Sequence, residues 1–193
     1  MGLPGVEAAG SAIALFSAAN FSGLSASLSA LAIASPAAFA FSAGAVGIDP
    51  GEIASEWPCQ VVSTGLAFAI VPFRNLTALS NFKPDIGRAL AFLEGTDGRF
   101  FYFICPEAKG KMRARMFFYG GEDPATGSAA GCAASWMAKY GIAKSDEQMV
   151  IWQGVEAGRP SEIFVRASCE GDRVTNVRVG GYAAEVLRGT VTL

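Results

Sequence analysis

One short run of the sequence combines residues that could bind an acidic metabolite and move a proton. Asp123 follows two glycines and precedes Pro124, and the chain continues as Ala-Thr-Gly-Ser, with hydroxyls at Thr126 and Ser128. Asp is favoured at the N-cap of a helix and Pro at its first position. The run therefore predicts a helix that begins here, with Asp123 as N-cap and Pro124 as first helical residue.

The start of such a helix is suited to an anion. The backbone N–H groups near Thr126, Gly127 and Ser128 would point out of the helix end, where the helix dipole favours a carboxylate or phosphate. The Asp123 carboxylate beside them could accept a proton. Together they suit proton transfer next to a carboxylate, although an Asp-Pro pair that only caps a helix remains open as an alternative. A phosphate-binding P-loop is excluded, because no Lys follows Gly127.

The composition excludes several other chemistries. The 193 residues include no histidine, which excludes Ser-His-Asp and Cys-His catalysis and any metal held by histidine. A net charge of −2 without a basic stripe argues against nucleic-acid binding. No metal or organic cofactor is implied. The four cysteines form no CxxC pair and are expected to be reduced and packed like small apolar residues; they are Cys59, Cys105, Cys132 and Cys169.

The helix that begins at the candidate site is expected to be enclosed by other structure. Its residues 129–135 are small on every side, and Gly141 after Lys139 supplies a stop signal. Gly127 and Gly131 each cost a helix about 1 kcal/mol relative to Ala. Their presence predicts that a strand or a ligand approaches the helix backbone closely.

The first 48 residues differ from the rest of the chain, because Glu7 is their only charged residue before Asp49. We therefore expect two parts, a segment of unknown structure over 1–46 and a folded domain over 47–193. A helical pattern runs through Leu24–Ala40. A membrane span through Leu24–Ile48 is a remote alternative, because serines and Pro36 interrupt it, and no basic region of a secretory signal precedes it. A cytoplasmic location is expected.

The domain is predicted to have a mixed α and β structure. Asp49-Pro50 indicates a short helix, and Pro84–Glu94 has apolar residues at helical spacing. A turn is expected from Pro106 to Gly110. The β-branched and aromatic runs predict strands over Gln60–Ser63, Ala67–Phe73, Arg99–Cys105, Met112–Tyr119, Met149–Gln153, Glu162–Ala167, Val174–Val179 and Ala183–Leu193.

Several ordered blocks resemble the second half of phenazine-biosynthesis-type (PhzF-like) isomerases. The central block runs from Gly121 through Asp123-Pro124-Ala125-Thr126-Gly127-Ser128 to Ala129. The other blocks are Gln60–Gly65, Gln153-Gly154, Gly158–Ser161 and Val177–Gly181. The resemblance covers about Gly47 to Leu193. It implies the α+β diaminopimelate epimerase-like fold, in which each half wraps a barrel-like sheet around a central helix and the active site lies between the halves.

The resemblance also implies roles for individual residues. Asp123 and Ser128 would be catalytic, and Thr126, Gly127 and Gly121 would help to bind a small carboxylate substrate without a cofactor. Arg159 could hold an anion from the loop Gly158–Ser161, or that loop could be an ordinary surface turn.

The family also has an acid/base glutamate and a Gly-His-Ala-Thr type motif in its other half, and neither appears here. Two hypotheses therefore stay open. In the first, the chain is a PhzF-like isomerase or one half of its catalytic unit. In the second, it is a non-catalytic, truncated member that binds a small anion or self-associates. Its expected protein partner is a second copy or a separate N-terminal half.

Overall fold

The computed structural model describes residues 13–14 and 43–182. Their strands form a nine-stranded sheet in the order β1-β9-β8-β7-β5-β4-β3-β2, with β6 paired to β5 off this path. Most neighbours are antiparallel, but β3 pairs with β4 and β5 with β7 in parallel. The strands are β1 (Ile13–Ala14), β2 (Gln60–Ser63), β3 (Ala67–Pro72), β4 (Phe100–Ala108), β5 (Lys111–Phe118), β6 (Gly121–Asp123), β7 (Met149–Gln153), β8 (Ser161–Glu170) and β9 (Arg173–Tyr182).

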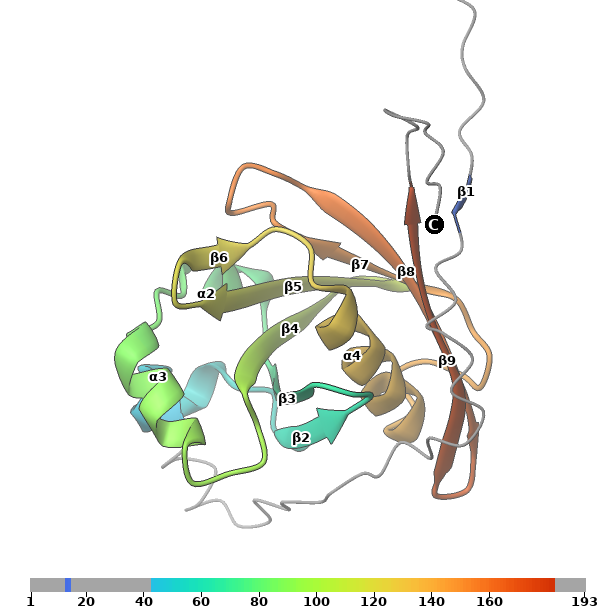
Figure 1. Cartoon of the computed structure of the whole chain (residues 1–193), viewed down its shortest axis with the longest axis horizontal. Helices are drawn as coiled ribbons and strands as arrows, with labels where there is room; N and C mark the ends of the chain where they lie inside the picture. Colours follow the sequence, from blue (N-terminus) through green and yellow to red (C-terminus); the bar gives the residue numbers. More distant parts are fainter. Residues whose placement is uncertain (1–12, 15–42, 183–193) are drawn as a thin grey trace, which may run out of the picture.

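The helices divide between the two faces of this sheet. The sheet curls around α4 (Gly127–Lys139), while α2 (Leu76–Asn81) and α3 (Ile86–Leu93) pack on its other face, against β4 (Figure 1). A short 3-10 helix, η1 (Pro50–Glu52), precedes β2. The sheet thus separates an inner layer that contains α4 from an outer layer that contains α2 and α3.

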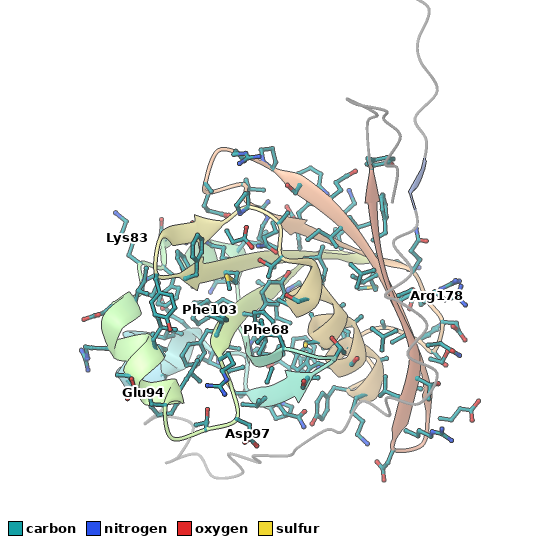
Figure 2. All side chains as sticks on the ribbon, viewed as in Figure 1. Phe68, Lys83, Glu94, Asp97, Phe103 and Arg178 are labelled. Atoms are coloured by element: carbon teal, nitrogen blue, oxygen red, sulfur yellow. The ribbon has the colours of Figure 1, made fainter. Side chains whose placement is uncertain are left out.

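Each face of the sheet has its own apolar core. Because side chains alternate along a strand, β4 sends Tyr102 and Ile104 into the core around α4 and Phe101 and Phe103 into the core under α2 and α3. Figure 2 labels one aromatic residue of each core, Phe68 in the inner and Phe103 in the outer. Strand β4 is therefore buried on both faces over its first half.

The inner core encloses α4 from several sides. All ten residues from Ala129 to Ala138 are buried. A Cβ added at Gly131 would lie 3.2 Å from Thr64 Oγ1 and 3.5 Å from Val179 Cγ2. The turn between β2 and β3 and the strand β9 thus approach the same point of the helix. The predicted enclosure of α4, and the predicted close approach of a strand at Gly131, are both confirmed.

Most predicted elements are present close to their expected bounds, including the stop at Gly141, whose φ is 70°. Three differences from the predictions are found. Strand β4 continues through the predicted turn to Ala108, with a bulge between Pro106 and Ala108. The sequence reasoning also missed α2 and β6.

Two sequence predictions lie outside the described residues, the helical pattern of Leu24–Ala40 and the strand of Ala183–Leu193. Within the described ranges, no helix is both long and apolar enough to cross a membrane.

Candidate functional site

The turn from Asp123 to Thr126 connects β6 to α4 and differs from the prediction. Thr126, not Asp123, is the N-cap of α4, and its side chain makes no capping hydrogen bond to the helix. Asp123 ends β6 opposite Met116 of β5, and Pro124 lies before the helix. The assignment of Asp123 as N-cap was therefore wrong, because strand pairing with β5 extends the chain through Asp123 and delays the helix by three residues.

The Asp123 carboxylate is instead held by the residue that does cap the helix. Thr126 Oγ1 donates a hydrogen bond of 2.7 Å to Asp123 Oδ2. Among the described residues, the other oxygen, Oδ1, accepts only a long bond of 3.4 Å from Ala125 N. Asp123 is half-buried. One oxygen of this carboxylate is therefore anchored, and the other has much weaker contacts.

Behind this turn lies a buried glutamine that the site prediction did not include. Gln153, at the end of β7, is fully buried and bonds to both ends of the turn. Its Nε2 donates to Asp123 O and to Thr126 Oγ1, each at 2.7 Å. Its Oε1 accepts from Thr126 N at 3.2 Å and from Tyr102 OH at 2.9 Å. Gln153 thus joins the strand β7 to the start of α4.

Tyr102 completes this network from β4 and is also fully buried. Burial, and then the neighbouring Asp123 carboxylate, raises the pKa of the Tyr102 phenol above its usual value. The phenol therefore remains protonated and serves as a hydrogen-bond donor. Gln153 could have been noticed as a polar residue at the end of an apolar run, but the pairing of Tyr102 with it depends on strand order, which the sequence did not show.

Of the three N–H groups expected to bind an anion, that of Thr126 is buried and donates to Gln153 Oε1, whereas those of Gly127 and Ser128 lie at an open end of the helix. The bond from Ala130 N to Thr126 O, of 3.0 Å, begins the intrahelical ladder, so the amides of Gly127 and Ser128 precede it. Both residues are exposed, and a Cβ at Gly127 would meet nothing within 4 Å. Thr126 is buried. The start of α4 is thus open to solvent on the side of Gly127 and Ser128, while the rest of the helix is enclosed.

Glu122 is held on the opposite side of β6 from Asp123. It lies next to Asp123 in β6, so the two side chains point to opposite faces. Arg115 holds both Glu122 oxygens, with distances of 2.9 Å from Nε to Oε1 and 2.8 Å from Nη2 to Oε2. Arg115 Nη1 also donates to three carbonyls near the end of α2, those of Leu79, Ser80 and Phe82. Glu122 therefore belongs to a buried structural pair.

The loop that carries Arg159 packs against the candidate site through its backbone. Gly154 has a φ of 77°, and a Cβ there would collide with the carbonyl oxygens of both Pro124 and Arg159. Arg159 N also donates to Gly154 O at 2.9 Å. The structure thus brings this loop beside the Asp123–Thr126 turn, as expected, while the Arg159 residue is exposed.

The remaining candidate residue, Gly121, begins β6 opposite Phe118 with a φ of 128°. A cavity of about 40 Å³ lies elsewhere, in the core under α3, with Cys59, Val61 and Phe101 in its lining. None of the six predicted site residues lines it. Within the described residues, no cluster of three or more metal-ligating side chains is found.

Comparison with known proteins identifies the family. A sequence model of the PhzC-PhzF family, described as phenazine biosynthesis-like protein, matches residues 33–189. The chain belongs to this family. A trans-2,3-dihydro-3-hydroxyanthranilate isomerase of Pseudomonas chlororaphis is 38% identical over 142 residues, which cover 72% of this chain and 49% of that protein. The chain thus spans about half the length of the curated relatives it matches.

Solved structures agree with the fold. A PhzF family protein of Bacillus anthracis superposes with a TM-score of 0.64 at 22% identity, over 76% of this chain and 53% of that one. A protein of Pseudomonas aeruginosa described as a predicted epimerase gives a TM-score of 0.62 at 28% identity, over 80% of this chain and 54% of that one. The expected diaminopimelate epimerase-like fold, with a sheet curled around a central helix, is confirmed.

Proposed function

We propose that this chain supplies one half of an isomerase site that moves a proton on a small cyclic carboxylate without a cofactor. The supporting observation is the anchored Asp123 carboxylate beside the exposed amides at the start of the buried helix α4. The amides of Gly127 and Ser128, with the Ser128 hydroxyl, would hold the substrate carboxylate. Asp123 would take a proton from one ring carbon and return it to another, which shifts a double bond. Gly121 and Arg159 would border the substrate.

The substrate class is proposed from the relatives. Proteins that share this region are named trans-2,3-dihydro-3-hydroxyanthranilate isomerases. Such a substrate carries a carboxylate on a partly reduced ring, which matches an anion clamp next to a proton acceptor. We place the reaction in a biosynthetic step in the cytoplasm, which agrees with four free cysteines.

A second surface is proposed to complete the site. Three exposed apolar side chains, those of Leu66, Phe118 and Tyr119, lie at the same end of the sheet. Phe118 pairs with Gly121 at the start of β6. The pairing of Phe68 with Phe100 places Leu66 at that end as well. Tyr119 is 82% exposed and contacts Phe100, with ring centroids 6.1 Å apart. Exposed apolar side chains that gather at one end favour contact with another protein surface. The proposed partner is a separate N-terminal half or a second copy of this chain.

The test follows a proton into and out of a ligand. Binding is measured with the probe 3-hydroxyanthranilate, the aromatic relative of the named substrate. Proton exchange is measured with the dihydro compound in D₂O. We expect the chain to bind the probe, with amide shifts at Gly127 and Ser128, and to catalyse exchange. Asp123→Asn should lower the exchange rate by about 100-fold or more, while Asp172→Asn, a change at an exposed acid on the β8–β9 turn, should not.

The alternative function, a member of the family that only binds an anion, predicts a different result. The probe would still shift the amides of Gly127 and Ser128, but exchange would equal the buffer rate for the native chain and for Asp123→Asn alike. That result, obtained with and without a candidate N-terminal half, would overturn the isomerase proposal. Absence of the amide shifts would overturn both.

A further inference from the structure

Gln153 is the most strongly bonded buried polar side chain next to the candidate site, and the proposed chemistry gives it no role. It lies on β7, which pairs with β5 in parallel. Gln153 is separated from Asp123 by 30 positions in the sequence. Its side chain makes four hydrogen bonds to described residues, and these run to Tyr102 or to the Asp123–Thr126 turn. Three of these bonds hold the Asp123–Thr126 turn, which indicates that the buried Gln153 amide fixes the conformation of this turn.

The polarity of the network can be assigned without observing hydrogens. Thr126 N–H can only donate, so the Gln153 atom that faces it must be the oxygen. The carbonyl of Asp123 can only accept, so the atom that faces it must be the amide nitrogen. Two backbone groups of fixed polarity therefore set the orientation of the Gln153 amide.

This orientation also sets the direction of the Thr126 hydroxyl. Gln153 Nε2 donates to Thr126 Oγ1, so that oxygen is an acceptor toward Gln153. A hydroxyl has a single proton, and with Gln153 as donor that proton is free to point at Asp123 Oδ2, 2.7 Å away. The result is a directed chain of bonds from amide to hydroxyl to carboxylate. Oδ1 remains as the oxygen with weak contacts.

We infer that Gln153 is a positioning residue, which through Thr126 anchors Asp123 Oδ2 and leaves Oδ1 as the oxygen that takes the proton of the substrate. The inference rests on the proposed function for the role of Oδ1, but the anchoring itself does not. Tyr102 supports the arrangement from behind, because its phenol donates to the same Gln153 oxygen that accepts from Thr126 N.

The chain offers a matched control at the other end of α4. Gln60 is also buried, and its Oε1 accepts a hydrogen bond of 2.7 Å from Tyr140 OH, where Tyr140 is the C-cap of the helix. Gln60→Met and Gln153→Met thus remove the same group from opposite ends of one helix. Only Gln153→Met breaks a link to Asp123.

The first measurement does not depend on turnover. In each variant of the whole chain, the side-chain carboxyl ¹³C resonance of Asp123 is compared with that of the native chain at one fixed pH. Gln153→Met should move this resonance and expose the Thr126 hydroxyl proton to fast solvent exchange, whereas Gln60→Met should do neither. Should Gln153→Met fail to fold, Tyr102→Phe removes a single donor to Gln153 and should give the same changes with smaller size.

The second measurement separates turnover from binding. Gln153→Met should lower the rate of proton exchange into the dihydro substrate by about 10- to 100-fold, because a misplaced reacting group can cost that much. The Kd of 3-hydroxyanthranilate should stay within about threefold, because the side-chain hydrogen bonds of Gln153 run to Tyr102, Asp123 and Thr126 and not to Gly127 or Ser128, the residues proposed to hold the carboxylate. Gln60→Met should leave both values unchanged.

The outcomes separate the two proposals. An Asp123 resonance that stays in place in Gln153→Met, or moves equally in Gln60→Met, would overturn the positioning role. Equal losses in binding and turnover would also overturn it, since they would indicate a purely structural effect on the whole helix start. If the native chain catalyses no exchange with any partner, the proposed function fails, and the resonance comparison alone then decides whether Gln153 anchors Asp123.

Discussion

Burial determines how the cysteine side chains respond to pH. Loss of contact with water raises the pKa of Cys59 to about 12 and, with a further contribution from Glu107, that of Cys105 to about 11. Burial also raises the pKa of Cys132, whereas Cys169 is only half-buried. A protonated thiol is a poor nucleophile. These environments agree with a role of the three buried cysteines as small apolar core residues.

The raised pKa of Cys59 predicts a loss of stability in alkaline solution. An unfolded chain releases this proton near pH 9, the ordinary value, but the folded chain only near pH 12, so the thiol favours unfolding as the pH rises between these values. The expected loss from Cys59 is about 1 kcal/mol at pH 10. Urea unfolding at pH 8 and pH 10 measures this loss as the difference between the two free energies of unfolding. The difference should be smaller in Cys59→Ala than in the native chain. An equal difference in both proteins would contradict the assignment to Cys59.

The pair of Arg115 and Glu122 makes a second prediction at the level of single residues. Arg115→Met would leave the Glu122 carboxylate and three carbonyls near the end of α2 without their donor. Removing one partner of a buried pair costs about 3–5 kcal/mol. Urea unfolding of Arg115→Met should show a loss of this size.

The control for Arg115 removes both charges. The double variant Arg115→Met with Glu122→Gln should recover part of the loss, because a neutral amide is less costly to leave in a buried position than a carboxylate. No recovery in the double variant would indicate that the carbonyls of α2, and not Glu122, account for the role of Arg115.

At the scale of elements, local chemistry predicted the ends of several helices correctly. The Asp49 side chain accepts from Gly51 N at 2.8 Å, as expected of an Asp before the predicted helix. Asp85, which caps α3 through Arg88 N at 3.1 Å, lies inside the range predicted for that helix, so the predicted start was two residues too early. These caps depend on residues two or three positions apart, which a sequence shows directly. The strands were predictable for the same reason, because the alternation of buried residues is local.

The errors at this scale come from long-range pairing and from elements too short to show a pattern. Asp123 has the sequence of an N-cap, but pairing of β6 with β5 keeps it in an extended conformation. The six residues of α2 were missed although Asn75 caps them through Ala78 N, because the helix is too short to show a periodic pattern. The connection from Gln153 to Asp123 depends on the parallel pairing of β5 and β7, and no local signal encodes that pairing.

Close packing around α4 predicts opposite results for two of its glycines. Gly131→Val should destabilise the fold by about 1–3 kcal/mol, because its methyl groups would press on Thr64, Val177 and Val179. Gly127→Ala should be neutral or stabilising by up to about 1 kcal/mol, since a Cβ there meets nothing within 4 Å. Thermal or urea unfolding of both variants makes the comparison. A similar loss in both would show that helix geometry, and not contact with the sheet, explains Gly131.

At the scale of the whole molecule, the sheet separates two cores that differ in how firmly they hold their helices. The helix α4 is enclosed by strands β2, β3, β8 and β9, whereas α3 lies on the outer face of the sheet and buries only Ala89 and Leu93 (Figure 1). Beyond its exposed first residues, Gly127 and Ser128, the amides of α4 lie among buried residues and reach solvent when the sheet around them opens. Those of α3 can do so when that helix alone detaches.

This difference predicts the order of hydrogen exchange. Peptides from α4 should exchange most slowly, at the rate set by global unfolding, and added urea should speed their exchange steeply. Peptides from α3 should exchange faster and respond weakly to urea. Gly131→Val serves as the internal control, because it lowers global stability without touching α3. Its α4 exchange should therefore rise by the factor that corresponds to the measured loss in stability, while α3 exchange stays constant. Exchange of α4 as fast as that of α3 in the native chain would mean that the curled sheet opens without unfolding, and that the helix start carrying the proposed site is not held by the fold.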